Sequence, residues 1–224
     1  MLVLLIAVCG PAQAADVTAN VGFNSDYIFR GVKLSPSSAN GGVDLTAGGW
    51  YVGTWLADVD TELTNGIEID LYGGWTGQTN EWSYGVGGTG YLYTDSMIDN
   101  TYYELNLMGS YNLFTLDVAI GKYDTTPSQN YTFATGTFEK AGFIGRVGVW
   151  AQDFSGYYLE FGYGRTLAVQ DTELFDWKIA LIKANDIENL CTGAGCAPGE
   201  KNLLADHTSI VLEITRSFGV WSSK

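Results

Sequence analysis

Hydrophobic and polar residues alternate along most of this chain, which is the pattern of β-strands whose two faces meet different surroundings. Ile67, Ile69 and Leu71 share one face, for example, whereas Glu68 and Asp70 share the other. The alternation predicts twelve strands, over residues 17–32, 39–47, 50–60, 66–77, 81–93, 101–111, 113–123, 130–139, 141–152, 156–167, 173–184 and 207–221. It is weakest at 130–139, which is also compatible with a segment partly outside a membrane.

The connections between these strands alternate in length. Long polar connections such as KLSPSS, TDSMIDN and the stretch from about 185 to 206 take turns with short ones such as GG and GQTN. Transmembrane barrels have long extracellular loops and short periplasmic turns, whereas a soluble barrel has no reason for this difference. We therefore predict an all-β fold, a closed antiparallel transmembrane β-barrel of about twelve strands with both termini on the periplasmic side.

Aromatic residues lie beside the predicted short turns. Their rings favour the membrane interface, because they are apolar and several carry a polar group. The residues concerned are Trp50, Tyr51, Trp75, Trp82, Tyr84, Tyr111, Phe114, Phe218 and Trp221. Arg165 and Arg216 fall on outward faces near the same boundary, where long basic side chains reach lipid headgroups. This joint placement supports the membrane interpretation.

The N-terminal segment has the pattern of a secretory signal. Residues 2–8 are apolar, and Ala12-Gln13-Ala14 matches a cleavage site, although no Lys or Arg precedes the apolar run. The pattern predicts a signal peptide over residues 1–14 and an outer-membrane barrel domain over 15–224. It places the mature protein in the bacterial outer membrane.

The chain is acidic, with 11 Lys and Arg against 25 Asp and Glu and a net charge of −14. We expect no nucleic-acid partner, because binding to phosphates requires Lys and Arg. The acidity fits either a charged outer surface that keeps the protein soluble or an electronegative pore.

The polar faces of the strands would point into the barrel, because a sheet in lipid must close to satisfy its backbone groups. These faces carry nine acidic and three basic side chains, a net charge of −6. The predicted pore-lining residues are Asp26, Arg30, Asp44, Glu68, Asp70, Glu104, Asp117, Arg146, Glu160, Asp176, Lys178 and Glu213.

This lining predicts a narrow water-filled channel for passive passage of small hydrophilic solutes, with a preference for cations. Its partners are then outer-membrane lipid and the solutes or cations themselves, while the identity of the solute and a homo-oligomer stay open. The alternative is a closed structural or adhesive barrel whose inward charges pair with one another. Because three bases cannot neutralise nine acids, the lining favours a channel.

The first half of the chain resembles the TorF family of porins. The elements that carry the resemblance are SDYIFRG at 25–31, GTW at 53–55 and EIDLYGG at 68–74, within a similarity that is strong over residues 15 to about 123. The resemblance implies an outer-membrane barrel and a pore. It supplies no substrate and no catalytic residues.

Two cysteines, Cys191 and Cys196, sit in the Gly-rich segment CTGAGC. In a secreted chain, a disulfide that closes this segment is the expected interpretation. A metal site would need two more ligands, and His207 is the only histidine, so we predict neither a metal nor a cofactor.

A third hypothesis is an outer-membrane lipid hydrolase. A Ser–His pair oriented by an acid can cleave esters, and His207 has Asp206 beside it and Ser209 two residues on. No G-x-S-x-G motif supports this pair. We therefore expect that the protein is not an enzyme.

Overall fold

The computed structural model describes residues 14–60, 65–94, 102–123, 128–170, 172–191 and 199–223. Twelve strands of the described part form one ring. They are β1 (Ala15–Asn24), β4 (Ser38–Ala47), β5 (Trp50–Asp60), β6 (Asn65–Thr79), β7 (Trp82–Tyr93), β8 (Tyr102–Tyr111), β9 (Phe114–Tyr123), β10 (Gln129–Lys140), β11 (Phe143–Gln152), β12 (Phe154–Val169), β13 (Thr172–Leu190) and β15 (Thr208–Ser222). Three short strands, β2 (Tyr27–Phe29), β3 (Val32–Ser35) and β14 (Lys201–Ala205), lie outside this ring.

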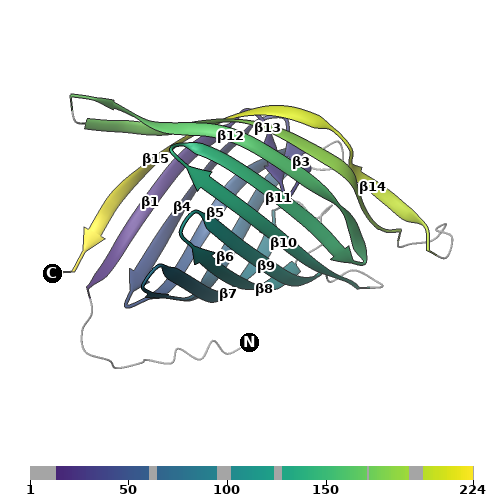
Figure 1. The fold of residues 1–224 in the computed structure, drawn as a ribbon, viewed down its shortest axis with the longest axis horizontal. Coiled ribbons are helices and arrows are strands. Elements are labelled where there is room, and N and C mark those ends of the chain that lie inside the picture. Colours follow the sequence, from purple (N-terminus) through teal and green to yellow (C-terminus); the bar gives the residue numbers. More distant parts are fainter. Residues whose placement is uncertain are drawn as a thin grey trace.

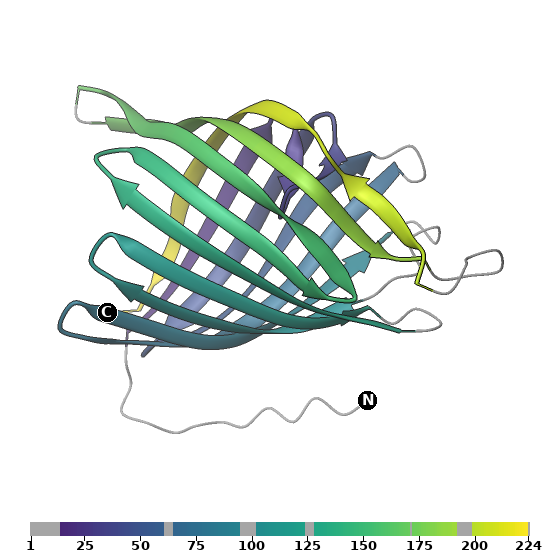
Figure 2. The same cartoon turned by 45° about the vertical axis from the view of Figure 1, so that its right-hand side comes forward.

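Each strand of the ring pairs with its neighbours in antiparallel order (Figures 1 and 2). The pairings of β12 with β13, of β13 with β15 and of β15 with β1 close the sheet. The prediction of a closed antiparallel barrel of twelve strands is therefore confirmed. Among the described residues, no helix is long and apolar enough to span a membrane.

The two ends of the barrel differ. The turns at 48–49, 80–81, 112–113 and 141–142 lie at one end, called here the short-turn end, together with Ala15 and Ser222. Asn80 and Asn112 adopt positive φ in these turns, a conformation that Asn tolerates and that tight hairpins require. The opposite end, called the long-loop end, holds the longer connections, and there β14 pairs with β13 over part of the segment predicted as loop.

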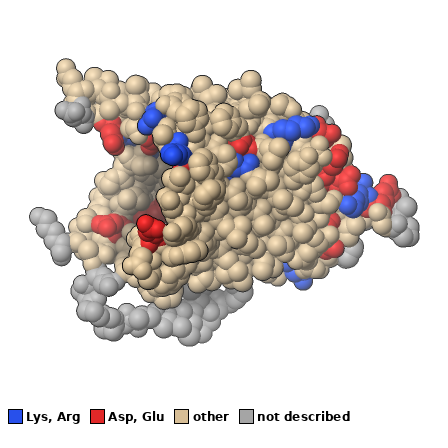
Figure 3. Space-filling model, in the orientation of Figure 1, with Lys and Arg blue, Asp and Glu red and all other residues tan. Residues whose placement is uncertain are grey.

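The outer face of the barrel is apolar between these ends. On β8, Tyr103 and Leu105 are 55% and 47% exposed, whereas Glu104 between them is 5% exposed. Figure 3 shows a broad outer surface largely free of charged side chains, with charges gathered toward the two ends. Such a surface fits hydrocarbon, where charged groups are costly.

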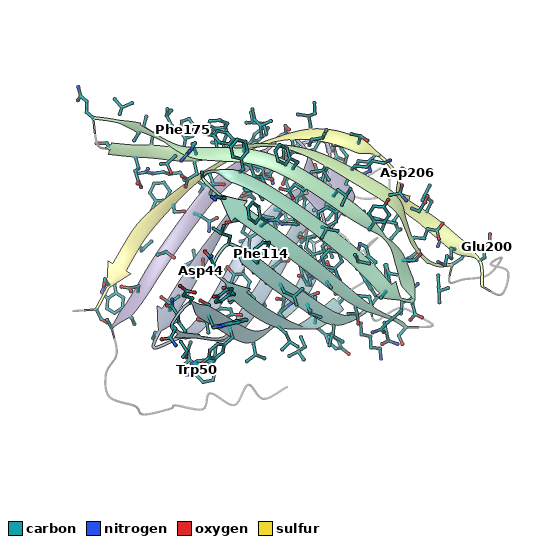
Figure 4. The ribbon with its side chains drawn as sticks, in the orientation of Figure 1. Asp44, Trp50, Phe114, Phe175, Glu200 and Asp206 are labelled. Carbon is teal, nitrogen blue, oxygen red and sulfur yellow. The ribbon has the colours of Figure 1, made fainter. Side chains whose placement is uncertain are left out.

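The aromatic residues predicted at the short-turn end mostly point outward there. Trp50, Trp82 and Phe114 are 58%, 57% and 62% exposed. Figure 4 shows Trp50 and Phe175 at this end, opposite Asp206 and Glu200. The prediction was wrong for Tyr51, which lines a cavity inside the barrel because it is on the other face of β5 from Trp50.

The first predicted strand, 17–32, was wrong in its second half. β1 ends at Asn24, and the chain then forms the two-stranded hairpin β2–β3. Tyr27 and Phe29, which the alternation assigned to the outer face, pack inside the barrel. The pattern could not reveal this change, because a hairpin strand alternates with the same period of two as a barrel strand.

β10 is a complete strand of 12 residues, so the weak alternation at 130–139 did not reflect an incomplete strand. Its inner face carries aromatic and hydroxyl side chains, among them Tyr131, Phe133 and Thr135. Its outer face carries the small residues Ala134 and Gly136. Apolar residues therefore occupy both faces, and the contrast between them is low.

Candidate functional site: the barrel lumen

The hairpin β2–β3 occupies the middle of the barrel. Its tip, Arg30 and Gly31, has positive φ at both residues, the conformation of a tight two-residue turn. A Cβ at Gly31 would lie 2.5 Å from Ile187 Cδ1 and 2.9 Å from Tyr158 Cβ, so only glycine fits against this wall. The Trp150 indole N–H donates to the carbonyl oxygen of Arg30 over 3.1 Å.

Arg30 binds the opposite wall through its guanidinium group. Its two terminal nitrogens donate to the carboxylate oxygens of Glu104, each over 2.8 Å. The guanidinium also lies 4.7 Å from the ring centroid of Phe29 and 4.8 Å from that of Phe133, which favours the cation further. The pair is buried, since the side chains are 14% and 1% exposed. It fastens the hairpin tip to β8.

Glu104 is saturated with donors. Besides Arg30, it accepts hydrogen bonds from the hydroxyls of Tyr91 and Tyr131, over 2.9 and 2.7 Å, and from the Asn106 amide over 2.7 Å. A buried charge is tolerable only when it is paired and hydrogen-bonded, and this carboxylate meets both conditions.

A second carboxylate holds the side of the hairpin. Glu68 is 0% exposed and accepts from the hydroxyls of Tyr27 and Tyr93, over 2.6 and 2.5 Å. Tyr27 belongs to the hairpin and Tyr93 to the wall, so Glu68 joins the two. Tyr27 also packs against Trp55, with ring centroids 5.6 Å apart.

The remaining wall acids near the hairpin have fewer partners. Asp44 accepts from the Tyr72 hydroxyl over 2.6 Å. The Oδ1 atom of Asp70 is buried and has no hydrogen-bond partner among the described residues. Asp117 lines the lumen on both sides of Arg30. These acids lie on strands β4, β6 and β9, and they make this arc of the wall acidic.

The opposite arc of the wall, called here the paired arc, holds a chain of ion pairs. Arg146 and Lys178 both bind Glu160, over 2.9 and 2.8 Å, and Lys178 also binds Glu213 over 2.9 Å. Four side chains from β11, β12, β13 and β15 thus neutralise one another. The two arcs therefore differ in charge: the acids of the paired arc are neutralised by bases, whereas Asp44, Asp70 and Asp117 of the acidic arc have no ion pair in the described part of the chain.

The twelve residues predicted to line the pore all lie in or beside the lumen. Ten are on barrel strands, and Asp176 among them is exposed near the short-turn end, where it accepts from Thr166 over 2.6 Å. Asp26 and Arg30 belong to the segment that enters the lumen, which corrects their predicted position on a wall strand. The sequence reasoning missed Lys33, which pairs with Asp26 over 2.6 Å, because it assigned KLSPSS to an external loop.

Pairing divides the nine predicted acids. Four have a Lys or Arg nitrogen within 4.0 Å, and in the described part of the chain the other five have none. These five are Asp44, Glu68, Asp70, Asp117 and Asp176. Because Lys33 neutralises Asp26, the other eight acids stand against the three bases Arg30, Arg146 and Lys178, a net charge of −5.

Open space surrounds the hairpin. A cavity of about 440 Å³ lies between Arg30 and the acidic arc, and one of about 310 Å³ lies between Arg30 and the paired arc. Figure 3 shows that the short-turn end is hollowed, with acidic side chains at its rim. A third cavity, of about 210 Å³, lies on the long-loop side of the hairpin.

The residues of the hydrolase hypothesis do not form a triad in this arrangement. The Asp206 carboxylate accepts from Lys183 Nζ over 2.5 Å, and His207 Nε2 has no hydrogen-bond partner among the described residues. Burial, followed by the cations of Lys33 and Lys183, lowers the pKa of His207 below its usual value. Within the described ranges, no group of three or more His, Cys, Asp or Glu side chains could hold a metal ion.

Two predictions fall wholly or partly outside the described residues. The signal peptide over 1–14 has only Ala14 within them, and Cys196, the predicted partner of Cys191, lies beyond them. The signal peptide and the disulfide stay predictions.

Residues 8–194 match a family of bacterial proteins of unknown function, Gcw_chp. The chain belongs to this family. The family match does not bear on the resemblance to the TorF family, which stays a prediction. No curated protein sequence matches the chain.

Several solved outer-membrane proteins are similar to this member of the Gcw_chp family. The COG4313 outer membrane channel from Pseudomonas putida F1 is 12% identical, with a TM-score of 0.48 over 94% of this chain and 97% of that one. OccK2 (OpdF) from Pseudomonas aeruginosa, in complex with glucuronate, is 12% identical with a TM-score of 0.41. The alignment covers 92% of this chain but only 62% of OccK2. An anion-selective porin from Comamonas acidovorans is 10% identical with a TM-score of 0.36, over 93% and 99% of the two chains. Similarities of this size do not extend to a solute or a selectivity.

Proposed function

We propose that this protein is a porin-like channel of the bacterial outer membrane, for small hydrophilic solutes and with a preference for cations. The observation that carries the proposal is an apolar outer face closed around a polar lumen. Within the part of the chain that the structure describes, five acids of this lumen have no basic partner. In lipid a sheet must close, and the water-filled side then carries the polar residues.

The sign of the lumen supports the cation preference. A net charge of −5 within low-dielectric walls attracts cations and repels anions, because the walls concentrate the field. Salt should weaken the preference, since the Debye length falls from about 30 Å at 0.01 M to about 3 Å at 1 M.

Reversal potentials in planar bilayers across a KCl gradient test this proposal. We expect cation selectivity in dilute KCl that fades as the salt concentration rises. The double variant Asp70→Asn/Asp117→Asn should reduce it, because neither carboxylate is ion-paired in the described structure. Its matched control, Asp60→Asn/Glu81→Gln, removes the same charge from exposed positions outside the lumen and should leave the selectivity unchanged. Anion selectivity in dilute KCl would contradict the proposal.

The hairpin favours a second candidate, a closed barrel with a structural or adhesive role. It fills the middle of the lumen and is held by Glu68 and Glu104. Replacing residues 26–36 with a short Gly-Ser turn separates the candidates, because Asn24 and Ser38 already face each other across β1 and β4. A channel should conduct before this change and conduct more after it. Silence of both folded forms in the bilayer would favour the closed barrel.

A further inference from the structure

The cavity on the long-loop side of the hairpin differs from the rest of the lumen. It lies between Phe29, Val32 and Leu34 of the hairpin segment and residues of strands β7 to β14 near the long-loop end. Its volume of about 210 Å³ is below the roughly 300–1,000 Å³ of sites that hold drug-sized ligands. It therefore has room for a single small ring.

Aromatic rings from four strands form a continuous arc along its wall. Tyr102 stacks on Tyr123 with ring centroids 4.4 Å apart, and Tyr123 stacks on Phe154 at 5.4 Å. Phe154 in turn stacks on Trp150 at 5.2 Å. These mutual contacts hold the rings in fixed orientations before any ligand arrives, which lowers the entropic cost of binding.

No described residue that lines this cavity is charged. An ion that entered would lose its hydration without gaining an opposite charge, which is costly. The polar groups at its wall are neutral, namely the hydroxyls of Tyr102 and Tyr123 and the side-chain amide of Asn189. Tyr102 already contacts the Tyr93 hydroxyl and Asn189 accepts from Asn202, but a hydroxyl and an amide each have further donor or acceptor positions for a ligand. The cavity thus offers apolar ring surfaces together with a few uncharged polar groups.

We propose that this cavity binds an uncharged pyranose sugar at the long-loop entrance of the barrel. A pyranose ring has apolar C–H faces that pack on aromatic rings, and its edge carries hydroxyls that match neutral donors and acceptors. The inference rests on the proposed function in one respect, that solutes reach the lumen from the long-loop end. The sugar site would give the channel a second class of solute, neutral sugars, in addition to the cations that the acidic short-turn side favours.

Quenching of tryptophan fluorescence by methyl β-glucoside tests the site in the folded full-length protein, because Trp150 lines the cavity. We expect saturable binding of methyl β-glucoside and at least about ten-fold weaker binding of glucuronate and glucosamine, whose charges the cavity cannot compensate. Binding of cyclohexanol as tight as that of the glucoside would identify a merely apolar pocket and overturn the proposal.

Tyr123→Ala should weaken glucoside binding by at least about ten-fold, because it removes the ring that contacts both Tyr102 and Phe154. Tyr103→Ala removes an outward ring, 55% exposed, from the strand beside it and should change nothing. Leu34→Trp fills the cavity from the hairpin side and should also abolish binding, which keeps the test valid where Tyr123→Ala fails to fold. Glucoside binding unchanged in folded Tyr123→Ala or Leu34→Trp would overturn the site.

The sugar site and the channel can fail separately. A protein that conducts ions but shows no saturable glucoside binding contradicts only the sugar site. A protein that binds the glucoside but never conducts contradicts only the channel.

Discussion

The two sides of the hairpin β2–β3 present different surfaces to a solute. On the short-turn side the lumen is hollow and charged, with acids such as Asp70 and Asp117 on its wall. On the long-loop side it is narrow, aromatic and uncharged among the described lining residues. Hydrated ions favour the first surface and neutral rings the second, so the hairpin divides one barrel into two chemical compartments.

The division depends on a few contacts at the hairpin tip. Arg30 lines both charged cavities on the short-turn side, while Phe29 beside it lines one of them and the aromatic cavity. The Arg30 guanidinium lies over the Phe29 ring, so this ring stands at the boundary between the two environments. The comparison teaches that a short inserted segment, and not the wall alone, decides what each part of the lumen can bind.

The largest expected effect comes from Arg30→Ala, which should break the division. It leaves Glu104 buried without its cation, and breaking a buried ion pair costs about 3–5 kcal/mol. We expect a lower free energy of unfolding in urea and a larger single-channel conductance, because the tip loses its anchor. Arg165→Ala removes an exposed arginine from the outer face and should have little effect on either. Wild-type conductance in Arg30→Ala would show that the hairpin does not obstruct the pore.

Glu160→Gln should shift the balance between the two arcs. Glu160 is the shared partner of Arg146 and Lys178, so its loss leaves two cations with fewer partners and makes the lumen less negative. We expect reduced cation selectivity in dilute KCl, by reversal potential, and a stability loss of about 3 kcal/mol. Glu81→Gln, in an exposed turn, is the matched control. A rise in cation selectivity would contradict the assignment of Glu160 to the lumen.

Tyr93→Phe should loosen the hairpin without releasing it. The hydroxyl donates to Glu68 over 2.5 Å, and a hydrogen bond to a charged group contributes about 1.5–3 kcal/mol. Glu68 keeps its second donor, Tyr27, so we expect a modest loss in urea unfolding and a conductance close to wild type. Tyr103→Phe changes an outward tyrosine and serves as the control. A conductance as high as that of Arg30→Ala would show that Glu68 is the main anchor.

The smallest effect concerns pH and His207, at the long-loop end. Burial and two nearby cations lower its pKa in the folded protein, so folding favours the neutral imidazole. Its contribution to stability is present above the unfolded pKa of about 6.5 and is lost as the pH falls through the folded value. His207→Asn should therefore show a slightly smaller drop in melting temperature between pH 7.5 and 5 than the wild type. An equal or larger drop would contradict this sign.

The sequence predicted most of the barrel, because alternation reports a local property. Each residue on a strand lies on one of two faces, and the lipid and the lumen impose opposite demands on those faces. The outward position of Tyr103 and the inward position of Glu104 follow from this alone. The inward glutamates and aspartates of β4, β6, β8 and β9 were identified in the same way.

The sequence did not predict the hairpin or its partners. Apart from Ser25, Tyr27 and Phe29 continue the apolar face of β1, so the period is the same whether the chain crosses the membrane or turns inward. The tyrosines that bind Glu68 and Glu104 were missed for a related reason. An inward tyrosine such as Tyr91 shares the parity of the lumen, and extending the alternation beyond charged residues would have found it.

By itself, the sequence determined the strands, the face of each side chain and the approximate strand number, since these depend on neighbours in the chain. Only the tertiary structure decided which charges meet. Arg30 and Glu104 are 74 residues apart, and they pair because the closed ring places β8 across from the inserted tip. A period of two carries no information about what lies across a barrel, so the pairing of charges follows from closure and from the path of the hairpin.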